Sequence, residues 1–144
     1  QNVVVAVGTA YQDILDYVGV KGELGKVVAG GAMMGPAVEN LSYPTTKTTS
    51  GLIFLSKAAA EPAPVNPCIR CGRCVEYCPM GLEPVEVNQA YAARDVQELG
   101  KLHADYCFNC GSCSFVCPAK RPCTQMMGLA KAFYLGEIKK GGNK

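Results

Sequence analysis

The same spacing of cysteines occurs twice in this chain, and it limits the possible fold and chemistry more than any other feature. Each run reads Cys-x2-Cys-x2-Cys-x3-Cys-Pro, and the runs begin at Cys68 and at Cys107. Eight of the nine cysteines of the chain lie in these runs. Bacterial proteins use this spacing to bind 4Fe–4S clusters. Two runs therefore predict two clusters, and two neighbouring clusters form a short path for single electrons.

The spacing suits a cubane cluster because cysteines at positions i, i+3 and i+6 allow one tight loop to reach three iron atoms. Gly72 and Gly111 hold the same place in the two loops, where glycine permits unusual backbone angles and close approach of amide N–H groups. The fourth cysteine, before the proline, binds the other cluster in two-cluster proteins of this pattern. We therefore predict two ligand sets, called the first site (Cys68, Cys71, Cys74 and Cys117) and the second site (Cys107, Cys110, Cys113 and Cys78).

Other chemistry fits these cysteines less well. Disulfides are disfavoured because the number of cysteines is odd, their spacing is short, and nothing in the chain resembles a signal peptide. Structural zinc is the more serious alternative, since repeated Cys-x2-Cys is also typical of zinc ribbons. Zinc, however, has no use for the third and fourth cysteines of each run. A catalytic cysteine would need a base, and the only histidine, His103, lies outside both runs, so no catalytic residue is predicted.

One cysteine and several cations near the runs have no assigned role. Cys123 is left over when both sites have four ligands, and we predict that it is a small buried apolar residue. Arg70, Arg73, Lys120 and Arg121 lie close to the runs in the sequence. They either compensate the negative charge of the clusters, whose potentials depend on local charge, or are ordinary solvated surface residues.

Length and composition exclude some classes of protein. The chain has 144 residues, enough for one domain or two small ones. Its net charge of +2 gives no argument for binding nucleic acid. The longest apolar run, residues 3–7, is far shorter than the ~20 residues of a membrane-spanning helix. We therefore predict that the chain has no transmembrane segment of its own.

A segment rich in alanine and proline, residues 58–66, predicts a linker because proline favours extended backbone. It separates a domain at residues 1–57 from a domain at 67–144 that contains every cysteine. In the first domain, apolar patterns predict three short strands and one helix. The strands are expected at 3–7, 26–29 and 50–55, and the helix between Gly8 and Gly19. A helix lying across a few short strands is the outline of a β-grasp domain, here a partial one.

The glycine-rich segment from Gly30 to Pro36 is not a phosphate-binding loop. It lacks the Lys-Ser/Thr of a P-loop and the G-x-G-x-x-G of a dinucleotide fold. We predict a tight turn in which Met33 and Met34 pack into the core.

Helical patterns predict an α-helical ferredoxin-type domain after the linker. One helix is expected to begin at Pro84, and a second after Asp95, which forms a capping box with Glu98. A third is expected after Pro122 and ends in a frayed tail at 139–144. Its predicted apolar stripe consists of Met127, Ala130, Tyr134 and Ile138. The 39-residue offset between the runs indicates an internal duplication rather than a solenoid.

The residues around the cysteines resemble those of the C subunit of the Rnf electron-transport complex. One example is Pro-Cys-Ile-Arg-Cys-Gly-Arg-Cys, which is followed by Cys-Pro-Met-Gly-Leu. The similar segments are 30–35, 47–52, 67–74, 78–82, 110–113 and 117–122. Two positions depart from the family pattern, since Ala32 replaces a proline and Cys123 replaces an apolar residue. Neither position is a predicted ligand.

This resemblance implies an α+β chain, with a partial β-grasp domain followed by the two-cluster domain. It implies an electron-transfer subunit of a ferredoxin:NAD oxidoreductase complex that is coupled to ion translocation. Such a subunit lies at the cytoplasmic side of the cell membrane and is peripheral. Its implied partners are other Rnf subunits, including a ferredoxin-like iron–sulfur subunit and integral-membrane subunits. FMN and NAD are implied for the parent subunit, whose flavin domain precedes the β-grasp domain, and not for this chain.

Two alternatives remain. The chain is a two-cluster relay module of a soluble flavin-linked oxidoreductase, such as a cobalamin reductase. Or it belongs to another class and is a zinc-stabilised interaction module.

Overall fold

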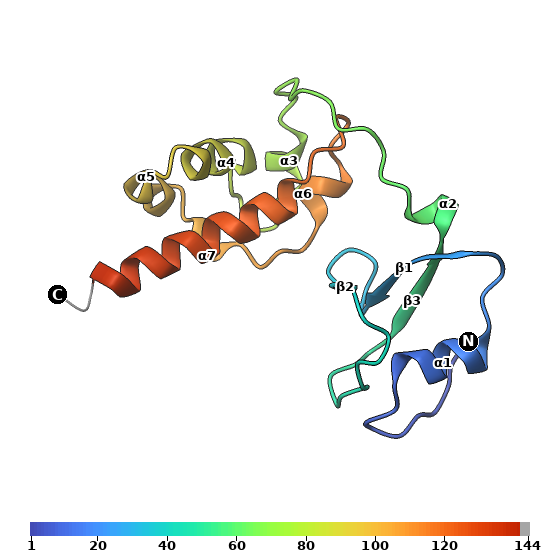
Figure 1. Cartoon of the computed structure of the whole chain (residues 1–144). Coiled ribbons are helices and arrows are strands. Elements are labelled where there is room, and N and C mark those ends of the chain that lie inside the picture. Colours follow the sequence, from blue (N-terminus) through green and yellow to red (C-terminus); the bar gives the residue numbers. More distant parts are fainter. Residues whose placement is uncertain (142–144) are drawn as a thin grey trace. The chain divides into compact units, whose positions relative to one another are not determined.

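The structure is a computed structural model of the chain, and it describes residues 1–141 (Figure 1). The chain forms two compact units, Gln1–Pro62 and Ala63–Lys144, which are considered separately below. The division falls inside the segment 58–66. This segment is not extended throughout, because the helical turn α2 (Lys57–Ala60) occupies its beginning. The last residues of the expected tail, 142–144, lie outside the described part.

The first unit is a small antiparallel sheet with the helix α1 (Tyr11–Val18) and the helical turn α2. Its strands are β1 (Leu24–Ala29), β2 (Ala37–Val38) and β3 (Leu52–Ser56). The strand order is β2-β1-β3, and β1 pairs with β3 in a register that places Val27 opposite Phe54. Val27 and Val28 of the central strand are buried, as is Ile14 of α1. The mixture of helix and antiparallel sheet confirms the α+β class.

Most of the predicted elements of this unit are present. The helix ends as expected at Gly19, which has φ +67° and donates its N–H to Leu15 O at 2.9 Å. The strands predicted at 26–29 and 50–55 are confirmed by β1 and β3. The strand predicted at 3–7 is wrong: this segment is irregular and largely exposed. Within residues 1–141 no strand pairs with it, and a β-branched run forms a stable strand only beside a partner.

The glycine-rich segment forms the predicted turn but not the predicted packing. Gly35 N–H donates to Gly31 O at 2.8 Å and closes the turn between β1 and β2. Met33 and Met34 are exposed by 48% and 59%, so their assignment to the core is wrong. The turn carries them beyond the end of the sheet, where nothing in the unit covers them.

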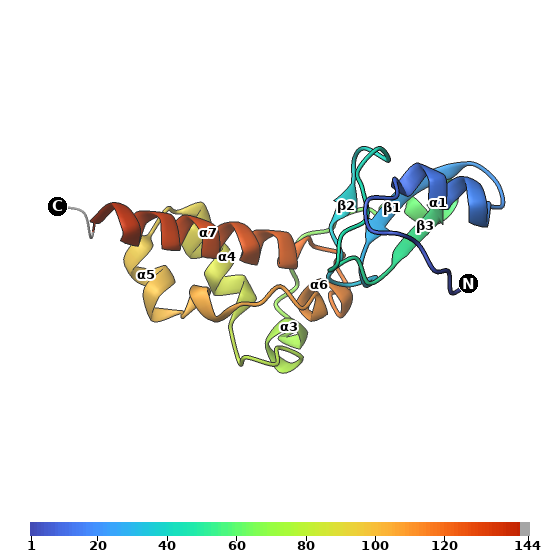
Figure 2. The ribbon, with the colours of Figure 1, turned by 90° about the horizontal axis from the view of Figure 1, so that it is seen from below.

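The second unit is helical and is built from two copies of one arrangement. Its elements are α3 (Arg73–Glu76), α4 (Pro84–Ala92), α5 (Val96–Lys101), the 3-10 helix η1 (Ala104–Tyr106), α6 (Ser112–Phe115) and α7 (Cys123–Gly141). The offset of 39 residues brings the start of α3 onto that of α6, and the start of α4 onto that of α7. Figures 1 and 2 show α7 lying alongside α4 and α5, with α3 beside α6. The structure thus extends the duplication from the cysteine runs to the helices.

Seven buried residues from five segments form the core of the second unit. They are Leu82, Val87, Ala90, Leu99, Ala104, Met127 and Ala130. Met127 and Ala130 confirm half of the predicted stripe on α7, and Tyr134 packs at its edge. The prediction that Ile138 belongs to this packed stripe is wrong, because Ile138 is 48% exposed. The reason is length: α7 has 19 residues whereas α4 has nine, so the end of α7 runs past the helix on which it packs.

Local signals for the ends of the helices are confirmed. Pro84 occupies the first turn of α4, and Asp95 caps α5 by accepting the Glu98 N–H at 2.9 Å. The Glu98 carboxylate does not complete the capping box, because it pairs with Lys101 at 2.8 Å. None of the helices in residues 1–141 combines the length and the apolar character needed to cross a membrane.

Candidate functional site

The two cysteine loops share an unusual backbone path. Gly72 and Gly111 have φ of +77° and +87°, and each begins a short helix. Arg70 and Asn109, at equivalent places two residues earlier, also have positive φ, +52° and +56°. Residues with a side chain rarely adopt this conformation, which costs roughly 1–2 kcal/mol. Its occurrence at the same position in both loops indicates that the geometry of each loop serves its cysteines.

That path directs backbone amides at sulfur atoms. The Arg70 N–H donates to Cys68 Sγ at 3.4 Å, and the equivalent Asn109 N–H donates to Cys107 Sγ at 3.4 Å. The Leu82 N–H donates to Cys78 Sγ at 3.3 Å. Amide donors stabilise a thiolate, which is the form of cysteine that binds metal.

The first site forms the wall of a cavity of about 440 Å³ in the second unit. Its four predicted ligands all line this cavity, namely Cys68, Cys71, Cys74 and Cys117. Three come from the first run and one from the second, as the predicted exchange of the fourth ligand requires. Cys68 and Cys71 are exposed, whereas Cys74 and Cys117 are half-buried.

The thiols of the first site are close enough to interact electrically. Burial raises the pKa of Cys74 and a backbone hydrogen bond lowers it, while the negative charges of Cys113, a cysteine of the second site, and of Cys117 and Cys68 of the first site raise it further. Several thiolates held together repel one another in the absence of a cation. The same arrangement becomes favourable around positively charged iron, which offsets the repulsion.

The second site lies deeper. Cys113 is buried, and this burial raises its pKa; a hydrogen bond with the Thr124 hydroxyl, at 3.5 Å, acts in the opposite direction. The charges of Cys107 and Cys110 raise the Cys113 pKa further. Cys78, the predicted fourth ligand, packs against the same hydrophobic core as Cys107. Three of the four predicted ligands, Cys78, Cys107 and Cys113, are therefore in contact with the core or are themselves buried.

The donor set fits a 4Fe–4S cluster better than a single ion. Among residues 1–141, no three His, Cys, Asp or Glu side chains converge closely enough to bind one metal ion. Zinc needs four ligands within about 2.3 Å of one point. The four cysteines of the first site instead line a cavity of about 440 Å³, together with other residues.

An asparagine that the sequence did not reveal lies in the same cavity. Asn88 of α4 lines it, and the buried Oδ1 of Asn88 has no hydrogen-bond partner. A buried polar group without a partner is costly, so Asn88 is suited to a polar occupant of the cavity. In the sequence, Asn88 resembles any polar residue of an amphipathic helix.

The cations singled out near the runs divide into two groups. Arg70, Arg73 and Arg121 line the cavity of the first site. Lys120 is exposed and is not part of the lining. Three of the four cations are thus placed to act on whatever the cavity holds.

Cys123 is buried, as predicted, with 4% of its surface exposed. It lines the cavity of the first site, and burial, followed by the charge of Cys117, raises its pKa to about 12.

We expect Cys123→Ala to leave the iron content of the chain unchanged, because both ligand sets are complete without it. Colorimetric iron and sulfide assays on anaerobically purified protein measure this. The matched control is Cys117→Ala, six residues away, which removes a predicted ligand and should lower the iron content. Equal iron loss in both variants would mean that Cys123 is a ligand.

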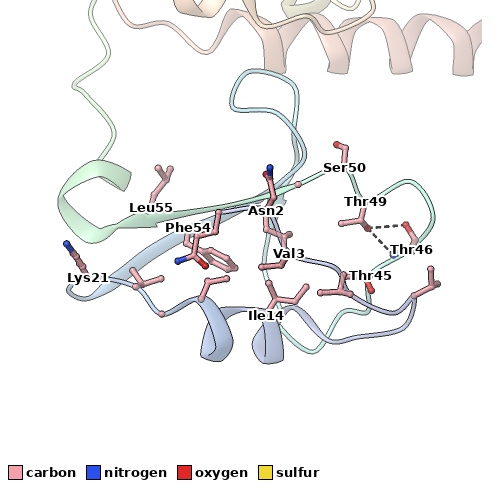
Figure 3. A pocket seen from close by; sticks show the side chains of 18 of the residues that line it. Asn2, Val3, Ile14, Lys21, Thr45, Thr46, Thr49, Ser50, Phe54 and Leu55 are labelled. Carbon is pink, nitrogen blue, oxygen red and sulfur yellow. Dashed lines mark hydrogen bonds between the residues drawn. The ribbon is translucent and has the colours of Figure 1, made fainter.

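The first unit has a cavity of its own, with a volume of about 970 Å³. Figure 3 shows Phe54 of β3 and Ile14 of α1 pointing toward one another within it. Its other lining residues are mostly apolar or carry hydroxyl groups, with Lys21 and Lys47 as the charged side chains. This lining does not present a nucleophile with a base, nor a set of metal ligands.

Comparison with known proteins agrees with the chemistry of the second unit. Residues 67–120 match the model of a family described as a 4Fe–4S dicluster domain. The matched range contains all eight cysteines of the two sites. The matched family thus bears out the prediction of two clusters.

Relatives resemble the chain over more of its length. It is 39% identical to the C subunit of the ion-translocating oxidoreductase complex of Rhodobacter capsulatus over 102 residues, which are 70% of this chain and 20% of that protein. It is 42% identical over 85 residues, 58% of the chain and 19% of the relative, to the C subunit of the proton-translocating ferredoxin:NAD(+) oxidoreductase complex of Clostridium ljungdahlii.

A third relative is the C subunit of the Na(+)-translocating ferredoxin:NAD(+) oxidoreductase complex of Acetobacterium woodii. The identity is 36% over 97 residues, which cover 67% of the chain and 22% of the relative. The matched part of the chain therefore spans about a fifth of the length of these relatives. These relatives and the dicluster domain confirm the resemblance to the C subunit of the Rnf complex.

Proposed function

We propose that this chain is the iron–sulfur relay of an Rnf-type complex and passes single electrons through two 4Fe–4S clusters. The observation that carries the proposal is the cavity of about 440 Å³, which is lined by cysteines of both runs. The first cluster is bound by Cys68, Cys71, Cys74 and Cys117, and the second by Cys107, Cys110, Cys113 and Cys78. The similarity to the C subunits of such complexes supports this function.

The residues of the chain hold the clusters and set their surroundings. The clusters, when bound, supply reversible one-electron chemistry. The amides of Arg70 and Asn109 donate to sulfur and stabilise the thiolates. Cys78 and Cys107 pack on the hydrophobic core, which excludes water from one side of the second site. No group of the chain has to act as a nucleophile or transfer a proton in such a relay.

The first unit is a partial β-grasp domain in this proposal, and it supports or docks the relay. Its three-stranded sheet and the helix α1 are consistent with that fold. In this proposal the domains are residues 1–57 and 67–144, joined by the linker 58–66. FMN and NAD bind to other parts of the parent subunit.

The assembly around the chain follows from the same proposal. The partners are the other subunits of the complex, among them a ferredoxin-like iron–sulfur subunit and integral-membrane subunits. The complex translocates ions, and the chain lies at the cytoplasmic side of the membrane without entering it. Co-purification with integral-membrane proteins supports this assembly, whereas co-purification with a soluble flavoprotein favours the cobalamin-reductase type.

The decisive experiment is the iron and sulfide content of the full chain after anaerobic purification. We expect about eight irons and eight sulfides per chain, a brown colour that bleaches with dithionite, and EPR signals of two coupled reduced clusters. A colourless protein with about two zinc ions would instead establish a zinc-stabilised module. Retention of both clusters in chain purified with a strong zinc chelator serves as the control.

A further inference from the structure

The internal duplication gives each position around the first site an equivalent around the second. Arg70 corresponds to Asn109, since the two are 39 residues apart and have nearly the same φ. By the same offset Arg73 corresponds to Ser112. Both pairs occupy equivalent backbone positions, because Arg73 and Ser112 each begin the short helix that follows. A difference in charge within a pair is therefore a difference between the two sites.

The offset also relates the segments that follow the fourth cysteines. Arg121 follows the fourth ligand of the first site, and its equivalent is Leu82, which follows Cys78. Leu82 is buried in the core, whereas Arg121 lines the cavity. At all three paired positions, a cation of the first site is replaced by a neutral residue in the second.

The charge of the first cavity is not balanced by its own lining. Among the residues that line it, three are arginines and none is Asp or Glu. Glu76 of α3 is exposed and lies outside the lining. In the second site one cation takes part, because Lys131 Nζ donates to the carbonyl of Cys107 at 2.7 Å. By the offset Lys131 corresponds to Ala92, which lines the first cavity, so these paired positions hold three cations at the first site and one at the second.

A polar side chain is a further difference between the two sites. Asn88 lines the first cavity and its buried Oδ1 has no hydrogen-bond partner, whereas its equivalent in α7 is Met127, a buried core residue. Rotation of the amide exchanges its oxygen for the NH2 group, which can donate to sulfur. No such donor exists at Met127.

The two sites also differ in their exposure to water. Cys68 and Cys71 of the first site are exposed, whereas Cys113 of the second site is buried and Cys110 is half-buried. Reduction adds one negative charge to a cluster, and water, cations and N–H donors all stabilise that charge. Burial in apolar surroundings does not.

We propose that the arginines and Asn88 of the first site give its cluster a higher reduction potential than that of the second site. This inference rests on the proposed function, because it needs both clusters. The downhill transfer moves one electron: the second cluster is oxidised by one electron, the first is reduced by one, and no proton or bond changes. The exposed first site is then the one from which electrons leave the chain.

The test exchanges the residues of the two loops. Arg70→Asn with Arg73→Ser gives the first loop the residues of the second, and Asn109→Arg with Ser112→Arg does the reverse. The exchange is matched because asparagine tolerates the positive φ of Arg70 well. An anaerobic titration of the full chain, followed by EPR, measures the midpoint potentials of both couples.

We expect Arg70→Asn/Arg73→Ser to lower the midpoint potential of the higher-potential couple and to leave that of the other couple unchanged. The ratio of reduced to oxidised cluster, at the wild-type midpoint potential, should fall about tenfold, which is 59 mV for a one-electron couple. Asn109→Arg/Ser112→Arg should raise the midpoint potential of the lower-potential couple alone. The inference would be overturned if Arg70→Asn/Arg73→Ser shifted the midpoint potential of the lower-potential couple, or of neither couple.

Two controls separate the possible failures. Iron content is measured in each variant, and if the double variant loses iron, Arg121→Leu replaces it as the test of the first site. Asn88→Met, which copies the second site, should also lower the higher couple, and Asn88→Gln should restore it in part. Wild-type chain without iron would refute the proposed function, whereas two clusters with unmoved potentials would refute only this inference.

Discussion

Combining Cys78→Ala with Cys113→Ala should leave about four irons per chain, whereas combining Cys78→Ala with Cys74→Ala should leave almost none. Both double variants remove two cysteines, and both remove Cys78. They differ in whether the second missing cysteine belongs to the same predicted ligand set. The expected difference is the loss of one cluster against the loss of two.

The physical reason is that ligands of one cluster act as a unit. Once Cys78→Ala has removed a ligand of the second site, loss of Cys113 costs no further cluster, and the two effects are not additive. Cys74 lines the cavity of the first site together with Cys117. Its loss therefore removes the cluster that the first double variant keeps.

Iron and sulfide assays of the anaerobically purified variants measure this difference, and EPR shows whether the surviving cluster is still a single 4Fe–4S species. Cys117→Ala with Cys74→Ala is the reciprocal control and should again leave about four irons. The opposite pattern, with four irons surviving in Cys78→Ala/Cys74→Ala, would mean that each run binds its own cluster. The exchange of fourth ligands would then be wrong.

The sequence predicted the chemistry of the second unit because spacing along the chain determines it. Cysteines three residues apart can reach one cluster whatever surrounds them, and a glycine occupies the same position in both loops. Helix ends were predictable for a similar reason, since Asp95 caps α5 through an amide only three residues away. Such signals are local, and the sequence contains them completely.

The errors concern contacts that are not local. The β-branched run at 3–7 has a strong preference for strand, but no strand in the described part of the chain pairs with it. Ile138 continues the apolar stripe of α7, but the helix it would pack on is shorter. Met33 and Met34 are apolar but lie on a turn beyond the sheet. In each case the residue type was interpreted correctly and its neighbours were not.

Asn88 shows the same limit within the site. Its position in α4 and its polar side chain give no sign that its oxygen is buried beside four cysteines. Only the fold brings α4 against the loop of Cys68 and the segment after Cys117. Residues near a predicted metal site that are not ligands therefore become visible only in the structure, whereas the ligands themselves are predicted from their spacing in the sequence.

The largest expected effect on stability comes from Leu99→Ala in α5. Leu99 is fully buried and belongs to the core cluster with Val87 and Met127. Removing three buried carbon atoms and leaving a cavity costs about 3 kcal/mol. Because Cys78 and Cys107 pack against this core, the loss should reach the second site before the exposed first site.

The measurement is the rate at which the full chain gives up iron to a ferrous chelator under anaerobic conditions. Release from the second site requires the core to open, so a loss of about 3 kcal/mol speeds it by about a hundredfold, while release from the first site changes less. Leu129→Ala is the matched control, because Leu129 is 52% exposed on α7, and substitution there changes stability by roughly 0.5 kcal/mol or less. Equal acceleration at both sites would show that the core supports them equally, and the deeper placement of the second site would then have no effect on how firmly it holds its iron.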